Sequence, residues 1–154
     1  MSQWFRVFGV SEVQPEPAAI LEHLRGKGVQ AEGHFRGDDQ GWFAADIALV
    51  PGEAPLQLER FLSTEEGIRA ELNTWAAWLE TCDYSPNSQK LMEHMVGTKQ
   101  LFTLRQPIDH SNEILVEKAC VGMCQFLAKE TTGIYQIDNR GFFAADGTLL
   151  LQEY

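Results

Sequence analysis

The sequence predicts an α+β fold in which two pseudo-symmetric β-α-β-β(-β) halves form an antiparallel sheet with helices packed on it, plus a central helical insert. Three observations support this: an internal repeat, the same order of local patterns in each half, and helical periodicity between the halves. The tract GWFAAD at 41–46 recurs as GFFAAD at 141–146, and eight of eighteen positions are identical between 33–50 and 133–150. Ordinary residue usage would give about one identity. The repeat therefore indicates duplication of one supersecondary unit.

The first half begins with an expected strand over 4–10, where Phe5 and Val7 alternate with their neighbours. Pro15 and Pro17 suit the start of a helix, which glycines at 26 and 28 would end. The remaining strands are expected over 31–36, over 42–49 and from Leu56 onward, with turn residues at 37–41 and 51–55.

The second half repeats this order. We expect a strand over 99–106, a helix over 111–130 capped by Ser111 or Asp109, and strands over 134–137, 142–145 and 148–154. Asp146-Gly147 predicts a two-residue type I′ turn before the last strand, because glycine accepts a positive φ.

Two further helices are expected between the halves. Ser63 and Glu66 have the spacing of a capping box for a helix that runs to about Thr81, and Ser85-Pro86 would open a shorter helix through Val96. The 154 residues then form a single domain, with a first half over 1–62, a helical insert over 63–97 and a second half over 98–154. The insert breaks the internal symmetry, which makes it a natural place for function.

Charge and composition exclude several classes of protein. The net charge of −10 opposes binding to nucleic acid or to anionic membrane. No apolar run approaches the ~20 residues of a membrane span, and no signal peptide is recognised at the N-terminus. Three cysteines, an odd number, indicate a reduced, cytoplasmic setting. No phosphate loop or dinucleotide-binding glycine pattern is present, so no cofactor is expected.

The central helix provides the main candidate site. Helical spacing places Ile68, Leu72, Trp75 and Leu79 on one stripe, with Trp78 at its edge and Glu71 between the two tryptophans. A carboxylate in an aromatic stripe should be paired, protonated or at a pocket. Glu71 is therefore the best candidate for a general acid or base or for an anchor of a cationic ligand. The alternatives are a buried pair with Arg60 or Arg105, or a carboxylate that reaches water at the rim of the stripe.

The tryptophans themselves have two interpretations. Trp75 and Trp78 fit a binding platform, because tryptophan is enriched at interaction hot spots, but their helical spacing also fits a core. His94 lies among methionines that can line an adaptable surface, although a packing role is the simpler interpretation.

Other chemistry-bearing residues are better explained by structure. Asp46 and Asp146 could pair across the pseudo-axis, but aspartate is also a common turn residue. Cys120 and Cys124 share a helix face without a Cys/His pair elsewhere at ligand spacing, so no metal site is expected. The run Asp109-His110-Ser111 does not have the dispersed arrangement of a hydrolase triad.

These observations favour a soluble, non-catalytic binding module for a protein or small molecule that is not identified by any motif. Its expected ligand-binding residues are Glu71, Trp75, Trp78 and His94. The alternatives are a small enzyme that uses Glu71 as general acid or base, with His94 or His110, and a homodimeric interaction subunit whose exposed strand or tryptophans pair with a second copy.

Overall fold

The protein contains one eight-stranded antiparallel sheet and four helices, in a computed structural model that describes residues 3–153. The elements, in chain order, are β1 (Trp4–Gly9), α1 (Pro17–Gly26), β2 (Glu32–Asp38), β3 (Gly41–Ala48), β4 (Leu56–Leu62), α2 (Ile68–Glu80), α3 (Ser88–Gly97), β5 (Gln100–Arg105), α4 (Glu113–Glu130), β6 (Gly133–Ile137), β7 (Gly141–Ala144) and β8 (Leu149–Gln152). The α+β class and the order of elements agree with the sequence prediction. Tyr154, in the expected last strand, lies outside the described residues.

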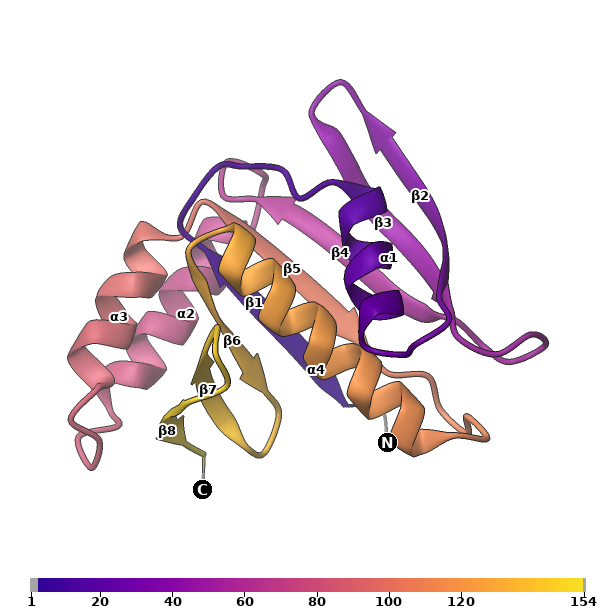
Figure 1. Cartoon of the computed structure of the whole chain (residues 1–154). Coiled ribbons are helices and arrows are strands. Elements are labelled where there is room, and N and C mark those ends of the chain that lie inside the picture. Colours follow the sequence, from indigo (N-terminus) through magenta and orange to yellow (C-terminus); the bar gives the residue numbers. More distant parts are fainter. Residues whose placement is uncertain (1–2, 154) are drawn as a thin grey trace.

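The two halves of the chain meet at the centre of the sheet. The strand order is β2-β3-β4-β5-β1-β6-β7-β8, so β1 and β5, the first strand of each half, lie next to each other (Figure 1). Their antiparallel register pairs Phe5 with Leu104 and Val7 with Phe102. The hairpins of the first half extend from β5, and those of the second half extend from β1. The last three strands of each half are therefore joined to the first strand of the other half.

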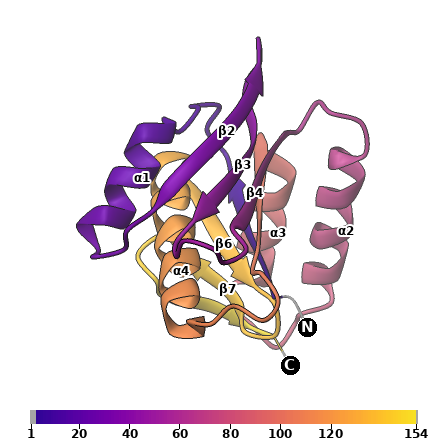
Figure 2. The same cartoon turned by 90° about the vertical axis from the view of Figure 1, so that its right-hand side faces the viewer.

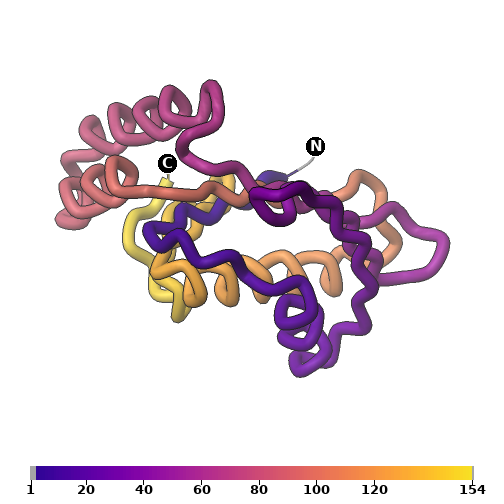
Figure 3. The backbone as a smooth tube through the Cα atoms, turned by 90° about the horizontal axis from the view of Figure 1, so that it is seen from above, coloured from indigo at the N-terminus to yellow at the C-terminus, as the bar shows by residue number. Residues whose placement is uncertain are grey.

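Helices cover both faces of this sheet. Figure 3 shows α1 and α4 on one side and α2 and α3 on the other. Strand β1 contributes to both apolar layers because its side chains alternate. Phe5 and Val7 lie in the core under α4, with Ile20 of α1, whereas Phe8 lies in the second core under α2, with Leu72. A strand buried on both faces is expected to be apolar, and Arg6 is the exception in the middle of β1.

Helix α4 packs on the sheet, and α1 lies beside it on the same side (Figure 2). Its buried residues surround much of the helix, as expected for an element with neighbours on two sides. At Gly122, an added Cβ would lie 3.7 Å from Leu24, an ordinary van der Waals distance, so α1 packs against this side of α4. The helix is capped by Asn112, which accepts a hydrogen bond from the Leu115 amide at 3.1 Å, and not by Ser111 or Asp109. No helix within residues 3–153 has the length and apolar character needed to cross a membrane.

The central insert forms a helix pair, but α2 begins later than predicted. The expected capping box at Ser63 is wrong, because Glu65 instead accepts a hydrogen bond from the Leu62 amide at 2.5 Å and the chain turns until Gly67. Gly67 has a φ of 86°, which favours glycine and ends the turn. Arg69, in the first turn of α2, donates to the carbonyls of Val96 and Thr98 at the end of α3. This contact fixes the antiparallel helix pair, because a cation is favourable at a helix C-terminus.

The loop between α2 and α3 protects one edge of the sheet. The side chain of Asn87 donates to the carbonyl of Leu150 at 2.7 Å, and the Tyr84 hydroxyl donates to that of Gln152 at 2.9 Å. These carbonyls belong to β8, the strand at one end of the sheet. Covering an edge in this way removes a template for pairing with another chain.

The repeated tract corresponds to two similar hairpins, β2–β3 and β6–β7. Gly41 and Gly141 begin the second strand of each hairpin at φ values of 103° and 133°. The pseudo-two-fold axis is not confirmed, because the meander β2-β3-β4 runs from the edge toward the centre, whereas β6-β7-β8 runs from the centre outward. The predicted type I′ turn at Asp146-Gly147 is wrong. Gly147 alone has a positive φ there, and a hydrogen bond from the Ala144 amide to the Thr148 carbonyl encloses three loop residues.

A buried polar cluster fixes the N-terminal loop against the sheet. Gln100, fully buried in β5, accepts from Arg60 Nε at 2.9 Å and donates to the carbonyls of Ser11 and Val13 at 2.7 and 2.8 Å. Arg60 also donates to the carbonyl of Trp42 at 3.1 Å. The cluster thereby joins β3, β4, β5 and the loop before α1.

Gln100→Leu should lower the free energy of unfolding by at least about 3 kcal/mol, because the Arg60 Nε–H group and two carbonyls lose their buried partner. Gln89→Leu, on an exposed turn of α3, is the control and should change it by less than about 0.5 kcal/mol. Denaturant unfolding of both variants measures the difference. A loss below about 1 kcal/mol for Gln100→Leu would contradict the structural role given to this cluster.

Candidate functional site

A hollow of about 420 Å³ opens between α2 and the ends of the outer strands on the same face of the sheet. Six residues line it: Thr74, Trp75, Trp78, Gln136, Asp138 and Glu153. The first three come from α2, Gln136 from β6, and the two carboxylates from the segments that follow β6 and β8. The hollow therefore joins the helical insert to the second half of the chain, and we call it the α2 hollow.

An aromatic corner forms one wall of the α2 hollow. The rings of Trp75 and Trp78 lie 6.1 Å apart at 84°, and Phe142 of β7 stacks on Trp78 with a centroid distance of 6.0 Å. Trp75 also contacts Phe142 and Phe8 edge to face. Trp78 nevertheless keeps 37% of its surface exposed. The packing holds the indole in place while part of it faces solvent.

The polar side of the hollow is organised by Gln136. This side chain is fully buried, and its Oε1 accepts from Arg6 Nη1 at 2.8 Å. Its Nε2 donates to Asp138 Oδ1 at 3.1 Å and to Glu153 Oε1 at 2.9 Å. One amide group thus fixes a guanidinium and two carboxylates, which places the two acidic side chains within hydrogen-bond distance of the same nitrogen atom.

The charges of the α2 hollow do not balance. Arg6 pairs with Asp138 at 2.7 Å, and its guanidinium carbon lies 5.1 Å from the centre of the Trp75 ring. Glu153 accepts only from neutral groups, the Gln136 amide and the backbone amide of Asn139 at 2.9 Å. Within residues 3–153, no ion pair involves Glu153. One formal negative charge is therefore left at the rim.

Two of the four predicted ligand-binding residues, Trp75 and Trp78, line this hollow, and the other two do not. Glu71 is exposed in the first turn of α2, and neither a hydrogen bond nor an ion pair joins its carboxylate to the described residues. The stripe that faces the sheet is formed by Leu72, Ala76 and Leu79. Of the alternatives considered for Glu71, the carboxylate that reaches water agrees with the structure, and pairing with Arg60 or Arg105 does not.

His94 fastens α3 to the centre of the sheet. Its Nε2 lies 2.8 Å from the carbonyl oxygen of Phe8 in β1, so the imidazole donates from this nitrogen. Burial lowers the pKa of His94, and the hydrogen bond to the Phe8 carbonyl opposes this shift. The residue has a packing role and does not line the α2 hollow.

The two aspartates of the repeated tract are far apart in the sheet. Asp46 lies inside β3 and pairs with Arg36 at 3.2 Å, whereas Asp146 accepts from the Thr148 amide at 2.9 Å in the turn before β8. Strands β3 and β7 are separated by four others. A carboxylate pair across a pseudo-axis is therefore not formed, and local hydrogen bonding explains both residues.

The remaining polar candidates are structural. Cys120 and Cys124 are buried in α4, and burial raises the pKa of Cys120 to about 12 and that of Cys124 well above its ordinary value. His110 accepts from the Asn112 amide through Nδ1 in the turn before α4, so Asp109-His110-Ser111 forms a turn and not a triad. Across the described residues, no cluster of three or more His, Cys, Asp or Glu side chains is arranged to hold a metal ion.

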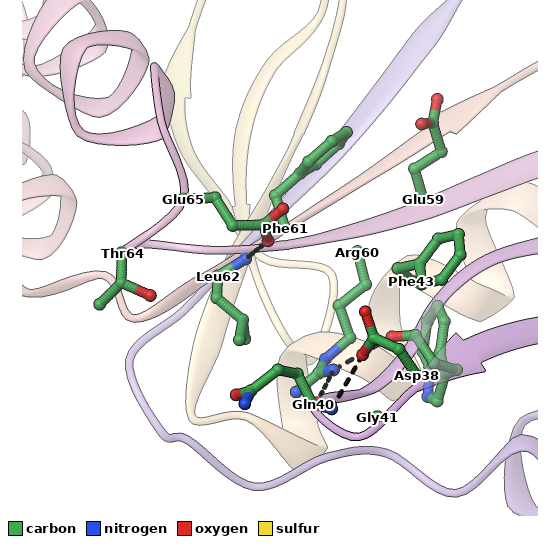
Figure 4. Close-up of a pocket in the computed structure, with 11 residues that line it drawn as sticks. Asp38, Gln40, Gly41, Phe43, Glu59, Arg60, Phe61, Leu62, Thr64 and Glu65 are labelled. Carbon is green, nitrogen blue, oxygen red and sulfur yellow. Dashed lines mark hydrogen bonds between the residues drawn. The ribbon is translucent and has the colours of Figure 1, made fainter.

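A second hollow, of about 310 Å³, lies near the turn between β2 and β3. Figure 4 shows Arg60 reaching toward Gln40 and Asp38 in this turn, while Glu59 points away from it. The Arg60 guanidinium donates to the carbonyls of Trp42 and Gln40, and burial lowers its pKa against the opposing effect of the Glu65 and Asp38 charges. Arg60 Nη1 and Nε already have partners within the protein, and the carboxylates of Asp38, Glu59 and Glu65 line the opening, so this hollow does not suit an anionic ligand.

Sequence reasoning missed four residues of the α2 hollow region: Arg6, Gln136, Asp138 and Glu153. One signal was present, since Arg6 interrupts an otherwise apolar central strand and must find a polar partner on its face of the sheet. Asp138 lies between two of the expected strands, where aspartate is a common turn residue. The sequence gives no sign that Gln136 is buried, because glutamine is mostly exposed in proteins.

His94→Gln should make the stability less sensitive to acid. Because the folded state lowers the pKa of His94, the unfolded chain binds a proton more readily, and the stability contributed above about pH 6.5 is lost as the pH falls toward the folded-state value. Unfolding measured from pH 7.5 to pH 5 should therefore show a shallower decline for this variant than for the wild type.

His34→Gln is the matched control, since it removes an exposed histidine from β2. His23, whose pKa burial also lowers, is retained in both variants and contributes equally to them. Equal slopes for the two variants would contradict the role assigned to His94.

Comparison with known proteins adds no functional information to this geometry: no protein family matches the chain, and no curated protein or solved structure is significantly similar to it.

Proposed function

We propose that the protein is a non-catalytic binding module that takes its ligand, a small molecule or a side chain of a partner protein, in the α2 hollow. The observation that supports this most strongly is the combination of a half-exposed indole, Trp78, with a polar group organised around the buried amide of Gln136. Binding sites typically combine aromatic surface with a few fixed polar groups.

The site is ordered before a ligand arrives. Phe142 stacks on Trp78, and the Gln136 amide holds the carboxylates of Asp138 and Glu153. Binding to a preorganised site loses less side-chain entropy than binding to a flexible one. The remaining lone pairs of the carboxylates are available to a ligand, because each carboxylate oxygen can accept more than one hydrogen bond.

The two alternative functions have less support. An enzyme based on Glu71 would need this carboxylate beside a histidine, but Glu71 is exposed on α2 and His94 is bound to the carbonyl of Phe8. A homodimer formed through an exposed strand would have to use β2, whose outward side chains include charged groups at Glu32, Arg36 and Asp38. Charged side chains on an edge strand oppose such pairing. The cytoplasmic setting is part of the proposal and is supported by the three free cysteines.

A thermal-shift screen with cationic, neutral and anionic metabolites tests the proposed function. A ligand at about 100 times its Kd should stabilise the fold by about 2.7 kcal/mol, which raises the Tm by roughly 5–10 °C for a domain of this size. Trp78→Ala should abolish the shift while its fold, checked by circular dichroism, is retained. Ile114→Ala, an exposed residue of α4 on the other face of the sheet, should leave the shift unchanged.

The proposal would be wrong if the ligands found in this screen stabilised the wild type and folded Trp78→Ala equally, because the α2 hollow would then not be their binding site.

A further inference from the structure

We infer that the ligand of the α2 hollow carries an organic ammonium group, which binds between the exposed indole of Trp78 and the carboxylate of Glu153. This inference rests on the proposed function and specifies the chemical class of ligand. It combines the balance of charge, the geometry of the aromatic rings and the hydrogen-bonding groups that remain free.

The charge balance favours a cation. The guanidinium of Arg6 is committed to Asp138 at 2.7 Å and to Gln136 at 2.8 Å. Glu153, in contrast, is held by two neutral donors and forms no ion pair with a described residue. A cationic ligand would supply the missing counter-charge. The net charge of −10 adds a field that attracts cations and repels anions.

The aromatic corner has the geometry of a cation site. Two indoles at 84° form adjacent walls, and a positive charge is attracted to the face of an aromatic ring within about 6 Å of its centre. Arg6 already lies over Trp75 at 5.1 Å, so the protein itself uses one of these rings in this way. Trp78 has no such internal cation among the described residues and keeps 37% of its surface exposed.

The hydrogen-bonding groups of the hollow indicate the same class of ligand, a cation. Both N–H groups of Gln136 are directed at carboxylates, and Arg6 Nη1 is shared between Gln136 and Asp138. The acceptors that remain free in the lining are lone pairs on Glu153, on Asp138 and on the Thr74 hydroxyl, whose own proton is donated to the Ala70 carbonyl. A ligand that donates or carries positive charge complements these acceptors, whereas a carboxylate or phosphate would be repelled.

Two pairs of compounds, each a cation and a neutral molecule of similar shape, test whether the positive charge itself increases affinity. Choline and its neutral isostere 3,3-dimethylbutan-1-ol have nearly the same volume, as do pentylammonium and pentan-1-ol. Titration calorimetry at low ionic strength should show at least one cation binding about tenfold or more tightly than its neutral partner. This preference should shrink as salt is added, because the hollow is partly exposed.

Glu153→Gln should reduce the preference for the cation to less than about threefold while the neutral compound binds as before. Glu66→Gln removes the same charge from an exposed position before α2 and should keep the wild-type preference. Thermal unfolding of both variants identifies any general loss of structure, and the ratio of cation to neutral affinity remains informative even when stability changes.

The outcomes distinguish this inference from the function on which it rests. If neither cation binds more tightly than its neutral partner, or if Glu153→Gln keeps the full preference, the inference is wrong. A sugar or an anion that stabilises the wild type but not Trp78→Ala would also overturn it, and would leave the proposed function standing. The proposed function itself fails only if the ligands found are insensitive to Trp78→Ala.

Discussion

The pairing of β1 with β5 is the constraint on which the rest of the structure depends. These strands open the two halves of the chain, and each carries the hairpins of the opposite half on its outer side. Alternation along β1 then divides the molecule into two apolar layers, with Phe5 and Val7 under α4 and Phe8 under α2. Neither layer could form from one half of the chain alone.

The α2 hollow follows from the same pairing. Register places Arg6 of β1 opposite Gln136 of β6, on the face that the insert covers. A charged residue in a central strand requires partners, and Gln136 and Asp138 provide them. Phe8, two residues along the same face, supports Trp75 through an edge-to-face contact at 6.0 Å. The polar and aromatic sides of the hollow are therefore both anchored to β1.

Local sequence patterns predicted the elements well and their arrangement poorly. The repeat identified two similar hairpins, but hairpin signals are identical whether a meander runs toward or away from the centre of a sheet, so the strand order was not predictable. Helical periodicity correctly grouped Trp75 with Trp78. The same periodicity wrongly placed Glu71 within the buried aromatic stripe, although this side chain is exposed. The angle of a residue around the helix axis does not show how far the sheet beneath the helix extends. Gln136 and Glu153 lie 17 residues apart in the sequence. Both are still farther from α2 along the chain, so the walls of the hollow meet only through tertiary pairing.

The most direct test of the proposed binding site is the response of the indole N–H signals of the tryptophans in ¹H–¹⁵N NMR spectra during titration with choline. The chain has four tryptophans, and Trp42 is a buried internal reference because its Nε1 donates to the carbonyl of Pro15 at 2.7 Å. The account predicts saturable shifts of the Trp75 and Trp78 signals with Trp42 unchanged. Saturable shifts of Trp42 with Trp75 and Trp78 unchanged would contradict it, because the ligand would then bind away from the α2 hollow.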